Sequence, residues 1–134
     1  LAFPEKEYVP TSPYQIITGN KLMGLHTLVL LDIQAEKERY MTANEGIELL
    51  LEMEKKLGEN VFTENSIACV VARAGSSNPT VMANTIGILK DKDFGPPLHT
   101  LVIPGNLHFM EVEALVKLAG LPGELKLGKK IQKL

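Results

Sequence analysis

Residues 67–75 read IACVVARAG, an apolar run that passes into small residues. The run at 67–71 is typical of a buried strand, and the small residues after it let the main chain approach a ligand closely. Open α/β sheets usually bind ligands at strand ends of this kind. Two other apolar runs, HTLVLLD at 26–32 and HTLVIPG at 99–105, end in comparable places. The sequence therefore predicts a ligand site where buried strands end.

Two helix starts stand out on either side of the strand at 26–32. Ser12 is a candidate N-cap with Pro13 at the first helical position, and Gly24 can end that helix. Thr42 and Glu45 form a capping box, because threonine at the cap is followed three residues later by glutamate. Apolar residues at helical spacing follow this box. They predict a helix to about residue 57, with glycine 58 as its stop.

The rest of the chain continues the alternation of strands and helices. Residues 25–33 form a nearly continuous apolar run, which indicates a strand covered on both faces. Further strands are expected at 66–72 and 98–103, and a short strand followed by a helix at 81–91. A last apolar helical face spans 109–119, where a glycine follows. This alternation predicts an α/β layer architecture.

Composition narrows the function classes. A chain of 134 residues with 45% hydrophobic residues fits one folded domain, and a net charge of −2 offers no electrostatic footprint for nucleic acid. No apolar run approaches the ~20 residues that a membrane span requires. The single cysteine, Cys69, cannot form an internal disulfide, which suits a reducing compartment. Its place in an apolar strand indicates a core residue rather than a nucleophile.

The three histidines lie in separate segments without paired metal-ligand spacing, so we expect no metal site. His26 begins a strand and is interpreted as a hydrogen-bonding residue there. His108 precedes a helix, where an N-terminal cap role is favoured. His99 opens the last strand after two prolines, and the bare sequence favours a structural role for it.

Three polar residues lie near the strand ends, and for two of them alternatives stay open. Ser76 fails the nucleophile-elbow pattern, because Gly75 directly precedes it and Asn78 stands two residues after it. Arg73 is expected to form an ordinary salt bridge, with contact to a target protein as the alternative. Asp32 either accepts a hydrogen bond from a substrate or marks the solvated end of its strand.

Four motifs in this order resemble the diphthine synthase family, within the tetrapyrrole-methylase-like superfamily. They are GLHTL at 24–28, YMTANE at 40–45, ARAG at 72–75 and PPLH at 96–99 continuing to the proline and glycine at 104–105. The resemblance runs from about residue 3 to about residue 121. It implies an α/β fold whose mixed β-sheet has helices packed on both faces. Residues 1–12 would be an extended linker or first-strand region, and residues 13–134 the carboxy-terminal domain of a two-domain enzyme whose amino-terminal domain is absent.

The family resemblance also implies an activity. It indicates an S-adenosylmethionine-dependent methyltransferase that acts on the amino group of a modified histidine of translation elongation factor 2, in diphthamide biosynthesis. S-adenosylhomocysteine would be the product. The resemblance further implies a homodimer, and a fragment that is inactive without the missing half. We expect a cytoplasmic protein, and the composition indicates that it binds neither membrane nor nucleic acid. Two alternatives remain: another methyltransferase of the superfamily with a precorrin substrate, and a non-catalytic dimerisation or interaction module.

Three residues match family positions that line the cofactor: Leu31, Ala74 and His99. Leu31 ends a strand and can offer an apolar wall to the adenine. Ala74 is small and lets the main chain come close enough to the adenine to hydrogen-bond it. For His99 the resemblance implies a main-chain contact or ring packing rather than proton transfer. No catalytic residue is expected, because the cofactor itself carries the activated methyl group.

Overall fold

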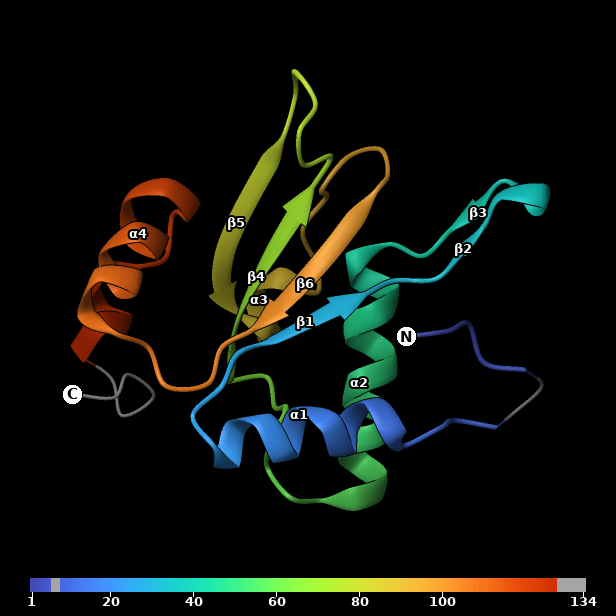
Figure 1. Cartoon of the computed structure of the whole chain (residues 1–134), viewed down its shortest axis with the longest axis horizontal. Helices are drawn as coiled ribbons and strands as arrows, with labels where there is room; N and C mark the ends of the chain where they lie inside the picture. The colour runs from blue at the N-terminus through green and yellow to red at the C-terminus, as the bar shows by residue number, and fades with distance from the viewer. Residues whose placement is uncertain (6–7, 128–134) are drawn as a thin grey trace.

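The chain folds around one four-stranded sheet with helices against both of its faces (Figure 1). The computed structural model describes residues 1–5 and 8–127. Its elements follow in this order: α1 (Ser12–Leu22), β1 (Thr27–Leu30), β2 (Ile33–Gln34), the 3-10 helix η1 (Ala35–Lys37), β3 (Arg39–Tyr40), α2 (Ala43–Leu57), β4 (Ile67–Ala72), β5 (Thr80–Thr85), α3 (Ile86–Leu89), β6 (His99–Ile103), α4 (Phe109–Ala119) and the 3-10 helix η2 (Gly123–Leu127).

The strands lie in the order β1-β6-β4-β5, and all three pairings in this sheet are antiparallel. Because helices cover both faces of this sheet, the predicted α/β layer architecture is confirmed. The expected mixture of parallel and antiparallel pairs is not found among the described strands. One reason is local, since β4 and β5 are joined by residues 73–79 alone. A connection of this length closes an antiparallel pair, whereas a parallel pair needs a crossover of a dozen or more residues.

The two faces of the sheet bury cores of different size. The larger core lies between the sheet and the helices α1, α2 and α3, and it includes the fully buried Tyr14, Leu50, Phe62 and Leu101. The smaller core lies under α4, around Cys69. β4 is central in the sheet and is therefore covered on both faces, as its continuous apolar sequence predicted.

The ends of two helices follow the sequence closely. The Thr42 side chain accepts a hydrogen bond from the Glu45 backbone, the Glu45 side chain accepts one from the Thr42 backbone, and Gly58 ends α2 with φ of 65°. His108 caps α4 in the same way, as expected. The start of α1 differs from the prediction. Ser12 is already helical, Thr11 is the cap residue, and no side chain caps this helix.

The predicted strand at 25–33 is shorter and more exposed than expected. It is regular only at β1, where Thr27 and Val29 are buried while Leu28 is 62% and Leu30 66% exposed. β1 is an edge strand, and α4 packs over the β4–β5 side of the sheet. One face of β1 therefore stays uncovered in this structure, so the prediction of a strand buried on both faces was wrong.

The link from β1 to α2 contains a hairpin that the sequence analysis did not identify. β2 and β3 pair antiparallel around η1 and project from the body of the domain (Figure 1). The described residues among 1–11 form no helix or strand, consistent with an extended segment, and the end of the expected domain at 128–134 lies outside the described residues. Among residues 1–5 and 8–127, every helix falls short of the length and apolar character that a membrane span needs.

Candidate functional site

A cavity of about 410 Å³ opens at the sheet edge where β1 ends and β6 begins. This volume lies in the range of small-molecule and cofactor sites. Most of its lining is apolar. The lining residues are Leu1, Ala2, Leu30, Leu31, Asp32, Ile33, Tyr40, Met41, Leu98, His99 and Thr100.

The antiparallel register of β1 and β6 brings Leu31 and His99 to this cavity. The last pair of their ladder is Leu30 with Thr100, so the next residues in register, Leu31 and His99, face each other just beyond it. Because β6 runs opposite to β1 and β4, its start lies at the end of those two strands. The residues at 103–105 therefore lie at the far end of the sheet. The expectation that all three apolar runs end in comparable places was wrong for the third run.

The position of Leu31 depends on a close approach of α2. Leu31 is 8% exposed, and a Cβ added at Gly46 would lie 2.8 Å from its Cδ2 atom. Glycine at position 46 thus lets the helix pack against the leucine that walls the cavity. Gly46 is buried within α2, where glycine lowers the stability of the helix relative to alanine. The close contact with Leu31 accompanies this loss.

Both ring nitrogens of His99 are already used inside the domain. Nδ1 accepts a hydrogen bond of 3.0 Å from the Ala43 backbone N–H, one of the first amides of α2 that has no helical partner. Nε2 therefore carries the proton and donates to Gly95 O at 2.9 Å and to Pro96 O at 3.2 Å. The ring also packs edge-on against Phe94. His99 can thus offer main chain or ring surface to a ligand, but no free nitrogen for proton transfer.

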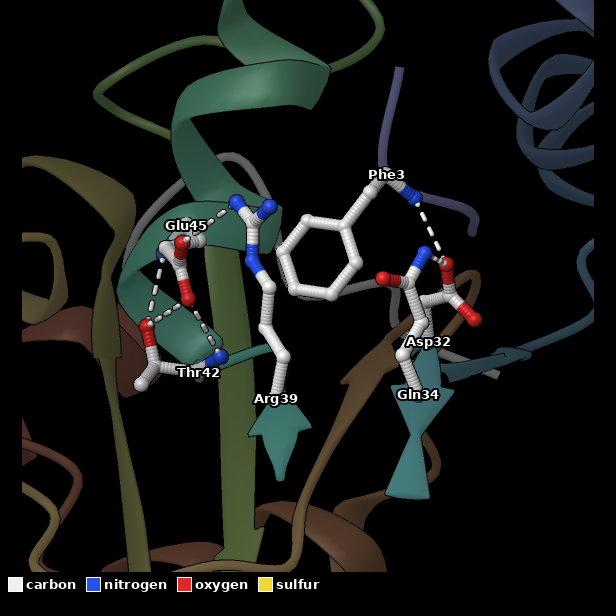
Figure 2. A network of polar contacts seen from close by, with 6 residues as sticks. All are labelled: Phe3, Asp32, Gln34, Arg39, Thr42 and Glu45. Carbon is white, nitrogen blue, oxygen red and sulfur yellow. Dashed lines mark hydrogen bonds and ion pairs between the residues drawn. The ribbon is translucent and has the colours of Figure 1, made fainter. Parts of the chain in front are cut away.

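One wall of the cavity is lined by residues of the amino-terminal segment and of the hairpin, and Figure 2 shows polar contacts that these segments make. The Leu1 nitrogen donates to Leu30 O at 2.8 Å, so this segment runs beside the free edge of β1. The Phe3 N–H donates to the Asp32 carboxylate at 2.9 Å. Arg39 of the hairpin lies over the Phe3 ring, 3.8 Å from its centroid. Both alternatives for Asp32 remain open, because this carboxylate lines the cavity and is only half-buried.

The same hairpin is tied to the start of α2. Arg39 Nη2 lies 4.0 Å from Glu45 Oε2, and Glu45 Oε1 accepts from the Thr42 N–H at 3.0 Å (Figure 2). The capping box of α2 therefore also orients the arginine that packs on Phe3. A local helix signal is thus linked to the segments that lie next to the cavity.

Ala74 is not brought into this cavity. It lies on the loop that follows β4, where it is exposed, next to Gly75 with φ of 81°. Ala72, at the end of β4, pairs with His99, so the loop leaves from the same edge of the sheet as the cavity. The structure thus places Leu31 and His99 together and Ala74 on a neighbouring loop.

Arg73 corrects a prediction. None of the ion pairs found among the described residues involves it, and its guanidinium donates instead to backbone carbonyls and to the Thr80 hydroxyl. The small residues around Arg73 in the sequence did not predict these hydrogen bonds. It depends on a loop about twenty residues further along the chain.

The other histidines hold the opposite end of the sheet together. His26 Nδ1 accepts from the Gly105 N–H, and its Nε2 lies 2.9 Å from Glu111 Oε2. The backbone N–H of His108 and the His26 ring lower the pKa of the Glu111 carboxyl. Within the described residues, no group of three or more histidine, cysteine or acidic side chains is arranged to hold a metal ion. Cys69 is buried, and this burial raises the pKa of its thiol, as befits a core residue.

The fold and the cavity together define an α/β domain with an open, largely apolar cavity at one edge of its sheet. The comparisons with known proteins narrow this class. No family model matches the chain. The chain is 55% identical over 115 residues to the diphthine synthase of Methanococcus maripaludis (strain C5), which covers 86% of the chain and 45% of the relative. It is 48% identical over 125 residues to that of Methanosphaera stadtmanae, which covers 93% of the chain and 48% of the relative.

Solved structures agree with the sequence comparison. A crystal structure of diphthine synthase superposes with a TM-score of 0.77 at 32% identity, covering 89% of this chain and 44% of the other. A protein of Entamoeba histolytica assigned as a diphthine synthase gives a TM-score of 0.82 at 36% identity, covering 86% of this chain and 47% of the other. The chain is therefore similar in sequence and fold to the carboxy-terminal half of diphthine synthases. It spans about half the length of the curated relatives it matches.

Proposed function

We propose that this chain supplies one wall of the cofactor cleft of a diphthine synthase, an S-adenosylmethionine-dependent methyltransferase. Its substrate would be the amino group of the modified histidine of translation elongation factor 2, and its product S-adenosylhomocysteine. The observation that carries the proposal is the largely apolar cavity lined by Leu31 and His99, in a chain that matches diphthine synthases over most of its length.

The residues of the cavity suit the adenosyl group. Leu31, Met41 and Leu98 provide apolar surface, and the main chain of residues 31 and 99 lies just beyond the last pair of the β1–β6 ladder. Asp32 lines the same cavity, where its carboxylate could accept a hydrogen bond from a ligand hydroxyl or pair with a positive charge of the ligand. S-adenosylmethionine supplies the activated methyl group when bound. The chain's own contribution is orientation, which can be worth several kcal/mol without any acid or base.

The cavity is open to solvent, which supports a cofactor cleft that a second part of the protein completes. We propose that the amino-terminal half of the protein closes the cleft and that the protein works as a cytoplasmic homodimer. The exposed Leu28 and Leu30, on the sheet face beside α4, provide apolar surface for such association. The single buried cysteine is in keeping with a reducing compartment.

Labelled S-adenosylmethionine and elongation factor 2 carrying the modified histidine provide the test. The complete protein encoded by the gene that carries this sequence is expected to transfer label to the factor. The 134-residue chain alone is expected to transfer none, since half of the cleft is missing. Transfer by the chain alone at the rate of the complete protein would contradict the shared cleft. Absence of transfer by the complete protein would contradict the proposed activity.

The same apolar surface supports a second candidate, an association module without activity of its own. Leu28 and Leu30 would then drive binding to another protein, and the cavity would bind no cofactor. Calorimetry with S-adenosylhomocysteine on the chain and on the complete protein separates the two, because only the methyltransferase is expected to bind it.

A further inference from the structure

Arg73 has an unusual backbone conformation directly after β4. Its φ of 54° lies in the left-handed region, which residues other than glycine adopt infrequently. Its backbone N–H donates to Leu98 O at 2.7 Å, so the turn is held against the residue that precedes His99. The direction in which the chain enters Ala74 is therefore set at Arg73.

The Arg73 side chain joins two loops through neutral acceptors. Nε donates to Asn78 O at 2.9 Å and Nη2 donates to Thr80 Oγ1 at 2.8 Å, both at the β5 side of the loop. Nη1 donates to Phe94 O at 2.7 Å and also to Pro96 O, both in the segment before β6. Only a guanidinium presents this many donors in a fixed planar fork.

The network continues from Arg73 to the cavity. Pro96 O receives hydrogen bonds from Arg73 Nη1 and from His99 Nε2. The His99 ring in turn accepts from the Ala43 N–H at the start of α2. A single chain of hydrogen bonds therefore links the loop of Ala74 with the segment before β6 and with α2.

We propose that Arg73 is a positioning residue for the cofactor: it holds the main chain of Ala74 and of Leu98–His99 in the arrangement that binds S-adenosylmethionine, without touching the cofactor itself. This inference rests on the proposed function. It follows from the location of the acceptors, because every segment that the guanidinium ties together either carries a candidate cofactor contact or adjoins one. Small displacements of such segments weaken binding and catalysis strongly.

The test uses the complete protein with the variants Arg73→Met and Arg73→Lys. Tyr14→Phe is the control for a loss of stability away from the cavity, because it removes a hydroxyl that is hydrogen-bonded to Glu54. Glu54 lies about 16 Å along α2 from Ala43. The measurements are the dissociation constant of S-adenosylhomocysteine by calorimetry, KM and kcat for S-adenosylmethionine, and the free energy of unfolding in urea.

We expect Arg73→Met to weaken S-adenosylhomocysteine binding and raise KM by about tenfold or more. Arg73→Lys is expected to lose less affinity than Arg73→Met, since lysine keeps the positive charge but lacks the planar guanidinium. Tyr14→Phe is expected to lower stability with unchanged affinity. A loss of stability in Arg73→Met with unchanged dissociation constant and KM would overturn the inference.

Two further outcomes are decisive. If Arg73→Met does not fold, Thr80→Val removes only the acceptor of Nη2, and we expect a several-fold loss of affinity; an unchanged dissociation constant would overturn the inference. If the unaltered protein and every variant alike fail to bind S-adenosylhomocysteine, the proposed function is overturned and this inference with it. Selective loss of binding in the Arg73 variants supports both.

Discussion

Replacing Glu54 by glutamine is expected to destabilise the domain more than any other isosteric change of a glutamate on α2. The Glu54 carboxylate accepts four hydrogen bonds at the end of this helix. Tyr14 donates through its hydroxyl at 3.0 Å, and Asn60, Val61 and Phe62 donate through their backbone N–H groups at 2.9, 2.7 and 2.7 Å. One side chain thus holds α1, the end of α2 and the loop before β4.

The loss in free energy of unfolding can be estimated from the carboxylate oxygen that glutamine lacks. Glutamine keeps one acceptor oxygen, but places an NH2 group against the Asn60 N–H and removes the charge from the remaining bonds. A hydrogen bond to a charged group contributes about 1.5–3 kcal/mol, and a neutral one about 0.5–1.5 kcal/mol. Because Glu54 is only half-buried, water replaces part of what is lost. We expect the free energy of unfolding to fall by about 2–4 kcal/mol.

The pH dependence has a definite sign. Burial raises the pKa of Glu54, but the hydrogen bonds from the backbone of Phe62 and Asn60, the Tyr14 hydroxyl and the backbone of Val61 outweigh it and hold the pKa below its ordinary value of 4.5. A carboxyl with a lowered folded-state pKa stabilises fully above the unfolded-state pKa. This contribution is lost as the pH falls through the folded-state value. The difference between the unaltered chain and Glu54→Gln should therefore be constant near neutral pH and shrink below pH 4.5.

Urea unfolding followed by circular dichroism, repeated between neutral pH and about pH 3, measures both effects. Glu52→Gln is the matched control, because Glu52 is an exposed glutamate on the same helix. It is expected to change stability by less than about 0.5 kcal/mol. The reasoning is refuted if Glu54→Gln behaves like this control, or if its deficit persists unchanged at low pH.

Three further predictions concern the cleft and association in the complete protein. Ala74→Leu is expected to leave the free energy of unfolding within about 0.5 kcal/mol, since Ala74 is exposed, while calorimetry shows weaker binding of S-adenosylhomocysteine; unchanged affinity would remove Ala74 from the site. Gly46→Ala gains about 1 kcal/mol of helix propensity but places a methyl group 2.8 Å from Leu31 Cδ2, so urea unfolding should show little net change while affinity falls. A retained affinity would show that Leu31 does not wall the cofactor. Replacing Leu28 and Leu30 together by lysine should shift sedimentation from dimer to monomer, and a dimer that survives would place the interface elsewhere.

The sequence by itself determined the elements whose signals are local. The capping box of Thr42 and Glu45, the glycine stop at position 58 and the His108 cap all appear where they were predicted. Each depends on hydrogen bonds between residues only a few positions apart, so the spacing alone is sufficient evidence. The buried β4 was predictable for a related reason, because a strand covered on both faces needs an unbroken apolar run.

The neighbours of each strand were decided only by the tertiary structure. The run at 25–33 is nearly continuously apolar, as the run of β4 is, yet β1 lies at the sheet edge with Leu28 and Leu30 exposed. Hydropathy reports that a residue is apolar, but not whether another element covers it. The antiparallel order likewise depends on how the chain returns to the sheet, which periodicity does not record.

The candidate site shows the same division. The family resemblance indicated Leu31, Ala74 and His99, and the structure places two of these at one cavity because the β1–β6 register sets residues 68 positions apart opposite each other. The Arg73 network was not visible in the sequence at all. Backbone carbonyls are present at every residue, so only the packing of distant loops determines which of them a guanidinium will meet.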